Sequence, residues 1–353
     1  MSAQMSPLEG QSRIVSEVIN RGLCIRCGGC VGLCPYFHYY DGKVVVSDGC
    51  EASTWRCVQI CPRLLNSRSS LYQDFFGKSE PGPLGGYLKI IAARSTEPKI
   101  REWAQYGGVV TSLAALALEK GLIRAIVLTD KGEELSPKGV LCTDREGILA
   151  CAGSRYTASG SLGILNKAIK EGHQDLGFVG LPCQMEALAR MASSEPDGEQ
   201  RAGSVTLRLG LFCTWALDHR ALRSYLEAKG ISSIARKYDI PPPPSEIFLV
   251  DSGDTVAEFP LSEVRELVQQ GCKYCEDMTA EFADISVGAL EGDSGWNTVI
   301  VRSERGLELF DMAFHSGVLE YKEMPQANLD HLIMAAANKR NRAVKTREEE
   351  AYG

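Results

Sequence analysis

The sequence predicts a mixed α/β domain preceded by a small cysteine-rich domain. Two dense groups of cysteines lie within residues 1–65. Residues 66–86 are rich in Ser, Gly and Pro, which is typical of a linker. Over residues 87–327, strand-like and helix-like patterns interleave, as in mixed α/β domains of ordinary size. Residues 328–353 are expected to form a charged helical tail.

The composition is that of an ordinary globular protein, with 44% hydrophobic and 24% charged residues. The net charge of -7 argues against nucleic acid as the main partner. The first ten residues have neither a basic start nor an apolar run, so no signal peptide is predicted. The stretch Ser112–Leu128 is interrupted by Glu119, Lys120 and Arg124, so no membrane span is expected. The 13 cysteines then indicate metal binding in a reducing cytoplasm.

The first cysteine group has the pattern C-x2-C-x2-C-x3-C-P and consists of Cys24, Cys27, Cys30 and Cys34. Three thiolates on one tight turn suit three irons of a cubane cluster, and the fourth, beside Pro35, suits a second cluster. Gly28 and Gly29 allow the backbone to fold closely around inorganic sulfide. A zinc site is less favoured, because zinc ligands usually form two pairs far apart in the sequence.

The second cysteine group consists of Cys50, Cys57 and Cys61. Two such groups separated by a short strand are the layout of a bacterial-type, two-cluster ferredoxin domain, in which the clusters exchange ligands. Cys61 is expected to complete the cluster held by Cys24, Cys27 and Cys30, which leaves Cys34, Cys50 and Cys57 for the other. Thr54 stands where regular spacing needs a cysteine. A 3Fe–4S cluster, a 4Fe–4S cluster with a non-cysteine or distant ligand, and no second cluster all remain open.

Hydrophobic periodicity predicts the elements of both domains. In the small domain we expect a helix over residues 11–22 and a strand over 43–46. In the large domain we expect strands over 87–93, 125–128, 177–181, 204–212, 247–250, 285–287 and 298–301. Helices are expected over 109–120, 217–229 and 304–315. No G-x-G-x-x-G motif opens a strand–helix unit, so a Rossmann-type nicotinamide or flavin site is not supported.

Four further cysteines suggest chemistry in the large domain. Cys183 and Cys213 each follow a predicted buried strand, which puts both at one edge of a sheet, and Cys272 and Cys275 form a C-x-x-C turn. The alternative is two structural cysteines beside a redox or zinc C-x-x-C. Cys142 and Cys151 lie in separate, unpatterned surroundings and are interpreted as apolar cysteines. The turn 105–111 has two glycines at a helix start, which suits an anion or an ordinary cap.

Seven stretches, in order, carry a resemblance to a known family: residues 92–96, 105–108, 153–157, 181–184, 271–275, 283–286 and 295–300. Over residues from about 87 to 340 the chain resembles the family of the beta subunit of coenzyme F420-reducing hydrogenase. Members bind FAD, and many oxidise or reduce the deazaflavin coenzyme F420. The implied fold is a flavin-binding α/β domain. The ferredoxin-like domain in front of it makes the chain look more like the F420H2 dehydrogenase input subunit or the formate dehydrogenase beta subunit.

The resemblance implies that Cys183, Cys213, Cys272 and Cys275 ligate a 4Fe–4S cluster beside the flavin. It also implies cofactor contacts for Gln105, Gly107, Gly108, Thr111, Ser154, Arg155, Tyr156, Thr157 and Trp296. Arg155 is a candidate partner for the FAD pyrophosphate or for the anionic tail of F420, because guanidinium makes paired hydrogen bonds to phosphate. The alternative is a surface arginine. Trp296 is expected either to pack against a flat ring or to lie in the core.

The expected function is an electron relay. Reduced F420 gives up a hydride to FAD, and FAD releases single electrons to the large-domain cluster, then to the N-terminal clusters and a partner protein. No acid–base residue is assigned. One alternative is the reverse flow, in which ferredoxin or a formate-oxidising subunit supplies electrons and F420 or another, pigment-like substrate accepts them. The other is a plain electron conduit with neither flavin nor a substrate of its own. Other subunits of a redox complex are the expected partners, through which the protein could lie beside a membrane. The basic stretch 339–347 suits an acidic partner or a solvated helix.

Overall fold

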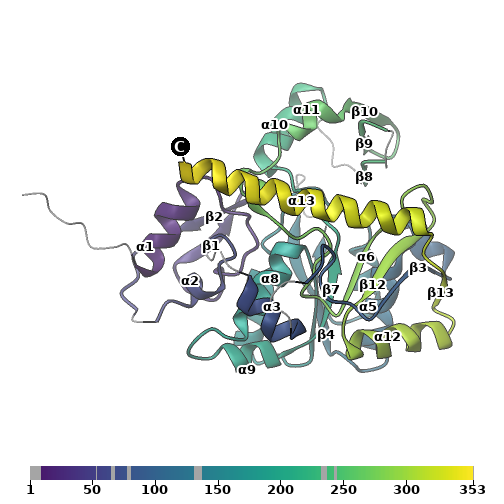
Figure 1. Ribbon diagram of the computed structural model, residues 1–353, viewed down its shortest axis with the longest axis horizontal. Coiled ribbons are helices and arrows are strands. Elements are labelled where there is room, and N and C mark those ends of the chain that lie inside the picture. The colour runs from purple at the N-terminus through teal and green to yellow at the C-terminus, as the bar shows by residue number, and fades with distance from the viewer. Residues whose placement is uncertain are drawn as a thin grey trace, which may run out of the picture.

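The computed structural model describes residues 9–52, 54–64, 68–77, 81–130, 137–231, 237–241 and 245–352. An eight-stranded sheet forms the centre of the fold (Figure 1). Its order is β13 (Leu319–Lys322), β3 (Lys89–Ser95), β12 (Asn297–Val301), β11 (Ile285–Ala289), β7 (Val205–Leu211), β6 (Leu176–Gly180), β4 (Ala125–Asp130) and β5 (Lys138–Cys142). Strands β4, β6, β7 and β11 are mutually parallel, and the remaining pairs are antiparallel. The predicted mixed α/β fold is therefore confirmed.

Helices cover both faces of the large sheet, and alternate residues of a strand point to opposite faces. On β4, Ile126 and Leu128 join one core cluster and Ala125 and Val127 join the other. The first cluster contains residues of α5 (Val109–Glu119), α6 (Arg145–Ala150) and α12 (Glu304–His315). The second contains residues of α3 (Ser69–Phe76), α7 (Ser161–Lys170) and α8 (Pro182–Met191). The near-continuous apolar runs of the central strands follow from this two-sided burial.

The N-terminal region, residues 9–64, has a small core of its own. It consists of α1 (Gly10–Ile14), a π-helical turn η1 (Val15–Ile19), β1 (Phe37–Tyr40), β2 (Lys43–Val46) and α2 (Arg56–Ile60). Strands β1 and β2 pair as an antiparallel hairpin. Leu33 and Ile60 belong to the second core cluster of the large domain, so the N-terminal region packs directly on α7 and α8. This contact holds the two cysteine-bearing parts of the chain together.

A separate three-stranded sheet lies away from the large sheet (Figure 1). Its strands are β8 (Lys237–Asp239), β9 (Ile247–Asp251) and β10 (Val256–Pro260), and it packs with α10 (His219–Ala228) and α11 (Leu261–Arg265). Only β9 and α10 were expected from the sequence. Strands β8 and β10 each have only one buried residue, so neither carries a clear periodic signal.

The expected linker over residues 66–86 contains helix α3, which the prediction missed. Leu71 and Tyr72 are buried, and the rings of Tyr72 and Phe76 stack on Phe282 of the large domain. This short amphipathic helix was missed because the Ser, Gly and Pro residues around it are typical of a linker. Residues 65–67 and 78–80 lie outside the described residues. Short elements were also missed elsewhere, among them β1, β5, β13, α4 (Pro98–Trp103), α6, α7, α8 and α9 (Gly198–Gly203).

The C-terminal helix α13 (Gln326–Tyr352) crosses the molecule from the side of the large sheet towards the N-terminal region (Figure 1). It packs against the short 3-10 helix η2 (Gln270–Tyr274). Ala336, Lys339 and Ala343 are buried on one of its faces, so the expected helical tail is part of the folded structure. Across the described ranges, no helix has the length and apolar character needed to cross a bilayer.

Candidate functional site

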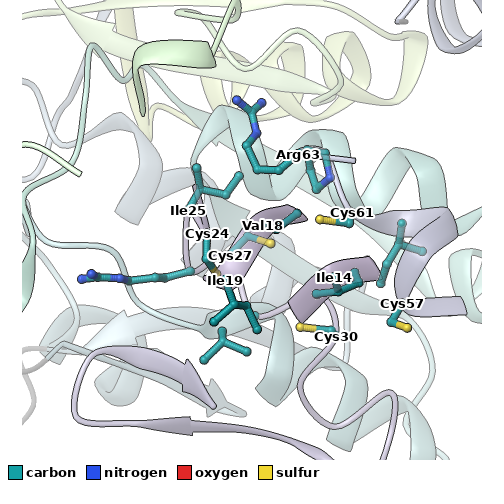
Figure 2. A pocket seen from close by; sticks show the side chains of 16 residues that line it. Ile14, Val18, Ile19, Cys24, Ile25, Cys27, Cys30, Cys57, Cys61 and Arg63 are labelled. Atoms are coloured by element: carbon teal, nitrogen blue, oxygen red, sulfur yellow. The ribbon is translucent and has the colours of Figure 1, made fainter. Parts of the chain in front are cut away.

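The first cysteine site consists of Cys24, Cys27, Cys30 and Cys61, which line one cavity (Figure 2). Apolar side chains line much of the remainder, among them Ile14, Val18, Ile19, Ile25, Val44 and Ile60. Burial raises the pKa of Cys24 to about 11 and that of Cys27 to about 12. Without a metal these thiols stay protonated at neutral pH, and binding of iron would release their protons. The donor set and its apolar surroundings fit an iron–sulfur cluster.

The loop that carries the first site is held by the large domain. Asn166 of α7 is fully buried, and its side-chain amide donates to the carbonyl oxygens of Gly29 and Val31, each at 2.8 Å. Gly28 has φ +82°, and a Cβ there would lie 2.4 Å from the carbonyl oxygen of Gly160. Only glycine fits this position, because the backbone is left-handed and another backbone lies against it. Asn166 itself was not singled out from the sequence.

The second cysteine site is the set Cys34, Cys50 and Cys57. Burial raises the pKa of the Cys57 thiol to about 11, and the neighbouring charges of Cys34 and Cys50 contribute. Cys57 also lines the cavity of the first site, so the two expected sites adjoin at this residue, and the sharing of one cluster by Cys34, Cys50 and Cys57 stays a prediction. Thr54 is exposed and residue 53 lies outside the described residues. The three possibilities for a cluster in this site stay open.

The third cysteine site consists of Cys183, Cys213, Cys272 and Cys275. Cys183 follows β6 and Cys213 follows β7, which are adjacent parallel strands, so the predicted meeting at one sheet edge is confirmed. The charges of the other three cysteines all act on Cys183, although burial is the largest cause of its raised pKa. Burial also raises the pKa of Cys213 to about 12.

Local hydrogen bonds fix the segments that carry the third site. Gln184 accepts from the backbone N–H of Leu181 at 2.8 Å and donates to the carbonyl oxygen of Ser159 at 2.9 Å, which positions the start of α8 around Cys183. The backbone N–H of Ala216 donates to the sulfur of Cys272 at 3.4 Å. Within the described part of the chain, no three His, Cys, Asp or Glu side chains form a site for one metal ion. A cubane differs, because each thiolate binds a separate iron.

The first and third cysteine sites meet where the N-terminal region packs on the large domain. Cys27 is among the cysteines whose charges raise the pKa of Cys183. A Cβ on Gly271 would lie only 2.2 Å from the carbonyl oxygen of Leu23, so the two cysteine-bearing segments touch backbone to backbone. Arg63 donates to the carbonyl oxygen of Gly271 at 3.3 Å across the same contact. The two sites are therefore neighbours.

The two stretches expected near a flavin converge on the three-stranded sheet. The Gln105 side chain donates to the carboxylate of Asp239 on β8. The hydroxyl of Tyr156 accepts from the backbone N–H of Ile240 at 3.1 Å, and the carbonyl oxygen of Tyr156 accepts from the N–H of Leu217 at 2.7 Å. Asp239 and Ile240 were not predicted, because nothing in their local sequence distinguishes them from an ordinary strand end.

Arg155 has an unusual environment. Its Nη1 donates to the carbonyl oxygen of Ser154 at 2.9 Å, but Nε and Nη2 are buried without a hydrogen-bond partner among the described residues. Burial lowers the pKa of Arg155. Arg155 is half-buried, so it is not a fully exposed surface arginine, and its role in binding an anion stays a prediction. Buried guanidinium N–H groups without partners fit an anionic group such as a pyrophosphate or carboxylate.

The turn before α5 is tightly packed. A Cβ on Gly107 would lie 2.8 Å from Oδ1 of Asn297, and the same oxygen accepts from the N–H of Val109 at 3.3 Å. Gly108 is the N-cap residue, with φ 75°, and Thr111 is half-buried in the first helical turn. Asn297 was not singled out, although it lies within the stretch 295–300 that carried the resemblance.

Trp296 and the pair Cys142 and Cys151 differ from expectation. Trp296 is half-buried, with Arg94 and Lys322 over its ring at 4.5 and 4.4 Å, so the core alternative is wrong. Stacking on a cofactor ring stays a prediction. The sulfurs of Cys142 and Cys151 lie 4.0 Å apart, so these cysteines do not have separate surroundings. Strand β5 and the end of α6 bring them together.

The fold and the gathered cysteines define an electron-transfer oxidoreductase. The chain belongs to the family of coenzyme F420 hydrogenase/dehydrogenase beta subunits. The N-terminal model of this family matches residues 90–166, and the C-terminal model matches residues 173–327. The chain is 34% identical over 269 residues to the coenzyme F420 hydrogenase subunit beta of Methanothermobacter thermautotrophicus, covering 74% of this chain and 94% of the relative. The suspected family is therefore confirmed.

Two further similarities concern the whole chain and the fold. The chain is 27% identical to a subunit of the F(420)H(2) dehydrogenase of Methanosarcina mazei, over 90% of this chain and 89% of that protein. It also matches a chain of the F420-reducing NiFe hydrogenase complex from Methanosarcina barkeri, with a TM-score of 0.71 and 31% identity, over 78% of this chain and 96% of that chain. Residues 90–353 are 264 of the 353 residues, about three quarters of the chain. The match to the dehydrogenase covers 90% of the chain, so it must extend into the N-terminal region.

Proposed function

We propose that this protein is an iron–sulfur flavoprotein that transfers electrons between coenzyme F420 and a partner subunit. The observation that carries the proposal is the contact between the first and third cysteine sites. The backbone of Gly271, next to Cys272, packs against that of Leu23, next to Cys24, where the N-terminal region meets the large domain, and Arg63 donates to the carbonyl oxygen of Gly271 across the same contact. Such an arrangement suits the passage of single electrons from one part of the chain to the other.

Each cofactor has residues that fit it. Cys183, Cys213, Cys272 and Cys275 would hold one 4Fe–4S cluster, and Cys24, Cys27, Cys30 and Cys61 another. When bound, FAD would accept a hydride from reduced F420 and release single electrons, which the clusters would carry. The second cysteine site would hold a 3Fe–4S cluster, a 4Fe–4S cluster with a non-cysteine or distant ligand, or no cluster, so the protein would contain two or three clusters.

The flavin side of the proposal depends on the turn 105–108 and the loop 153–157. The free N–H groups of Arg155 would bind the FAD pyrophosphate or the anionic tail of F420. Gln105 and Tyr156, both hydrogen-bonded to the three-stranded sheet, would fix the two segments relative to each other. Their task is to hold two rings face to face and to exclude water, so no side chain needs to move a proton.

The N-terminal region would provide the exit to a partner. The named relatives are subunits of hydrogenase and dehydrogenase complexes, and the structural match is to a chain of such a complex. The similarity to the F(420)H(2) dehydrogenase of Methanosarcina mazei covers 90% of this chain and therefore reaches into the N-terminal region. This favours oxidation of reduced F420 over the reverse reaction. Reduction of F420 by electrons from a formate-oxidising subunit or from ferredoxin is the second candidate.

The test is anaerobic mixing of the flavin-loaded protein with reduced F420 and a one-electron dye. We expect oxidation of F420 that requires FAD. Absence of turnover with flavin bound and clusters intact would overturn the assignment of F420 as substrate. Protein with intact clusters that binds no flavin and does not oxidise reduced F420 would instead indicate a plain electron conduit.

A further inference from the structure

The basic stretch of α13 is turned towards the third cysteine site. Lys339 is only 3% exposed. Its ammonium group donates to the carbonyl oxygen of Cys213 at 2.6 Å and to that of Asp277 at 2.7 Å. The sequence favoured a solvated helix for this stretch, with an acidic partner as the alternative. For Lys339 both interpretations are wrong, because packing of α13 on η2 buries its side chain.

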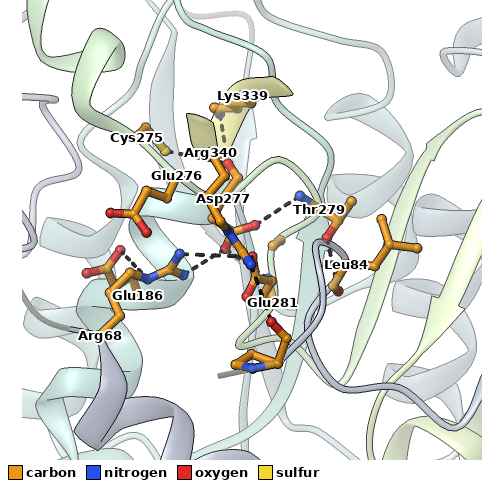
Figure 3. A network of polar contacts seen from close by, with 12 residues as sticks. Arg68, Leu84, Glu186, Cys275, Glu276, Asp277, Thr279, Glu281, Lys339 and Arg340 are labelled. Carbon is orange, nitrogen blue, oxygen red and sulfur yellow. Dashed lines mark hydrogen bonds and ion pairs between the residues drawn. The ribbon is translucent and has the colours of Figure 1, made fainter. Parts of the chain in front are cut away.

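Neighbouring basic residues of α13 bind the same segment (Figure 3). Arg340 forms an ion pair with the fully buried Glu281 at 2.9 Å. Arg347 pairs with Glu276 and donates to the carbonyl oxygen of Tyr274 at 2.9 Å. Helix α13 therefore holds the segment 274–281, which begins beside Cys275. Arg342 and Lys345, by contrast, are exposed.

The carboxylates around this segment are already paired with arginines. Arg68 lies 3.3 Å from Asp277 and 3.4 Å from Glu186, and Glu186 also pairs with Arg190 at 2.8 Å (Figure 3). The two hydrogen bonds of Lys339, in the described part of the chain, end on carbonyl oxygens instead. Its positive charge therefore acts on the backbone segments that carry Cys213 and Cys275.

We propose that Lys339 is a positioning residue that raises the reduction potential of the cluster in the third cysteine site. This rests on the proposed function. Reduction adds one negative charge to a cluster, and a nearby buried cation stabilises that charge with little screening by solvent. Net charge, hydrogen bonds and solvent exposure are the factors that set cluster potentials. A higher potential at this site makes the cluster a better acceptor of electrons from a flavin.

Neutral substitutions of Lys339 test the proposal. In Lys339→Gln and Lys339→Met we expect the one-electron reduction equilibrium of this cluster to become about tenfold less favourable, a downward shift of about 59 mV. Lys339→Arg keeps the charge and should restore most of the wild-type potential. Lys345→Gln is the matched control, because Lys345 lies on the same helix but its side chain is 76% exposed. The readout is an anaerobic redox titration followed by electron paramagnetic resonance.

The signal of this cluster is identified by its absence from Cys275→Ala. Wild-type protein without such a signal would overturn the proposed function itself. A signal with an unchanged midpoint potential in either neutral variant would overturn only the role of Lys339. Loss of the cluster from both neutral variants, with Lys339→Arg fully loaded, would likewise overturn it, because Lys339 would then hold the segment without setting the potential.

Discussion

The first and third cysteine sites are built in opposite ways. In the first, Cys24, Cys27 and Cys30 lie on one short loop, and Cys61 joins them from the end of a nearby helix. In the third, Cys183 and Cys213 meet only because β6 and β7 are neighbours in the sheet. A local site can be recognised from spacing. A site assembled at a sheet edge cannot be recognised from spacing alone, because it also depends on which strands are neighbours in the sheet.

The surroundings of the two sites also differ. The cavity of the first site is lined mainly by aliphatic side chains, with Arg26 and Arg63 among its residues. The third site has a buried ammonium group from α13 on the backbone of one of its cysteines. We therefore expect the two clusters to differ in potential. The difference shows that residues far from a ligand motif can decide its chemistry.

Removal of the third site should produce the largest effect. In Cys275→Ala, we expect reduced F420 to reduce bound flavin, while reduction of the first-site cluster slows by about a hundredfold or more, because the intermediate carrier is missing. In Cys30→Ala, the third-site cluster should still be reduced. Freeze-quenched samples followed by electron paramagnetic resonance measure both. If the first-site cluster is reduced at the same rate in wild type and in Cys275→Ala, the proposed order of electron transfer, from the third site to the first, is wrong.

The contact between the sites can be disturbed by one methyl group. Gly271→Ala would place a Cβ 2.2 Å from the carbonyl oxygen of Leu23, and backbone atoms cannot move aside cheaply. We expect the free energy of unfolding to fall by about 3 kcal/mol, as measured by anaerobic denaturant titration. Gly203→Ala is the control, because its Cβ meets nothing within 4 Å. Equal stability of the two variants would argue against a rigid contact at Gly271.

Substitution of Arg155 tests the proposed flavin site. In Arg155→Met, loss of charge-assisted hydrogen bonds should weaken FAD binding by about 2 kcal/mol, roughly thirtyfold in the dissociation constant. Arg155→Lys should lie between this variant and wild type. Arg124→Met is the control, because the side chain of Arg124 is 80% exposed. Flavin fluorescence titration gives the constants, and unchanged FAD binding in Arg155→Met would exclude the FAD pyrophosphate as its ligand and leave the anionic tail of F420.

The smallest expected effect concerns pH and the carboxylates next to the third site. Burial raises the pKa of Glu281 to about 7, whereas an unfolded glutamate titrates near about 4.3. The folded state therefore binds the proton more tightly. Its contribution to stability is complete below the unfolded pKa and is lost as the pH rises through about 7.

We expect Glu281 to contribute on the order of 1 to 2 kcal/mol of stability at pH 5 relative to pH 8, because the folded state holds the proton over much of this range and the unfolded state mostly does not. Glu281→Gln should flatten the pH dependence of the unfolding free energy by that amount. Glu308→Gln, at an exposed position of α12, should leave the dependence as in wild type. If the unfolding free energy of Glu281→Gln depends on pH as in wild type, the Glu281 carboxyl does not titrate between pH 5 and pH 8.

Much of the fold could be predicted because its central strands and long helices have strong patterns. The predicted helix 304–315 matches α12, and the predicted strand 43–46 matches β2. Helix α3 was missed because its apolar face becomes evident only against Phe282. The pairing of Cys142 and Cys151 was missed because their closeness depends on how α6 follows β5.

The sequence by itself determined the first cysteine site, the alternation of strands and helices, and the family. These properties depend on neighbouring residues, so spacing and periodicity express them directly. Only the tertiary structure decided that Arg155 lies half-buried with N–H groups that have no partner among the described residues, that the loop of the first cysteine site packs against the segment carrying Cys272, and that Lys339 points inward. Each of these results from packing between segments more than 80 residues apart or from burial by another element. No local pattern encodes such contacts, because the free energy that fixes them comes from surfaces brought together by the whole fold.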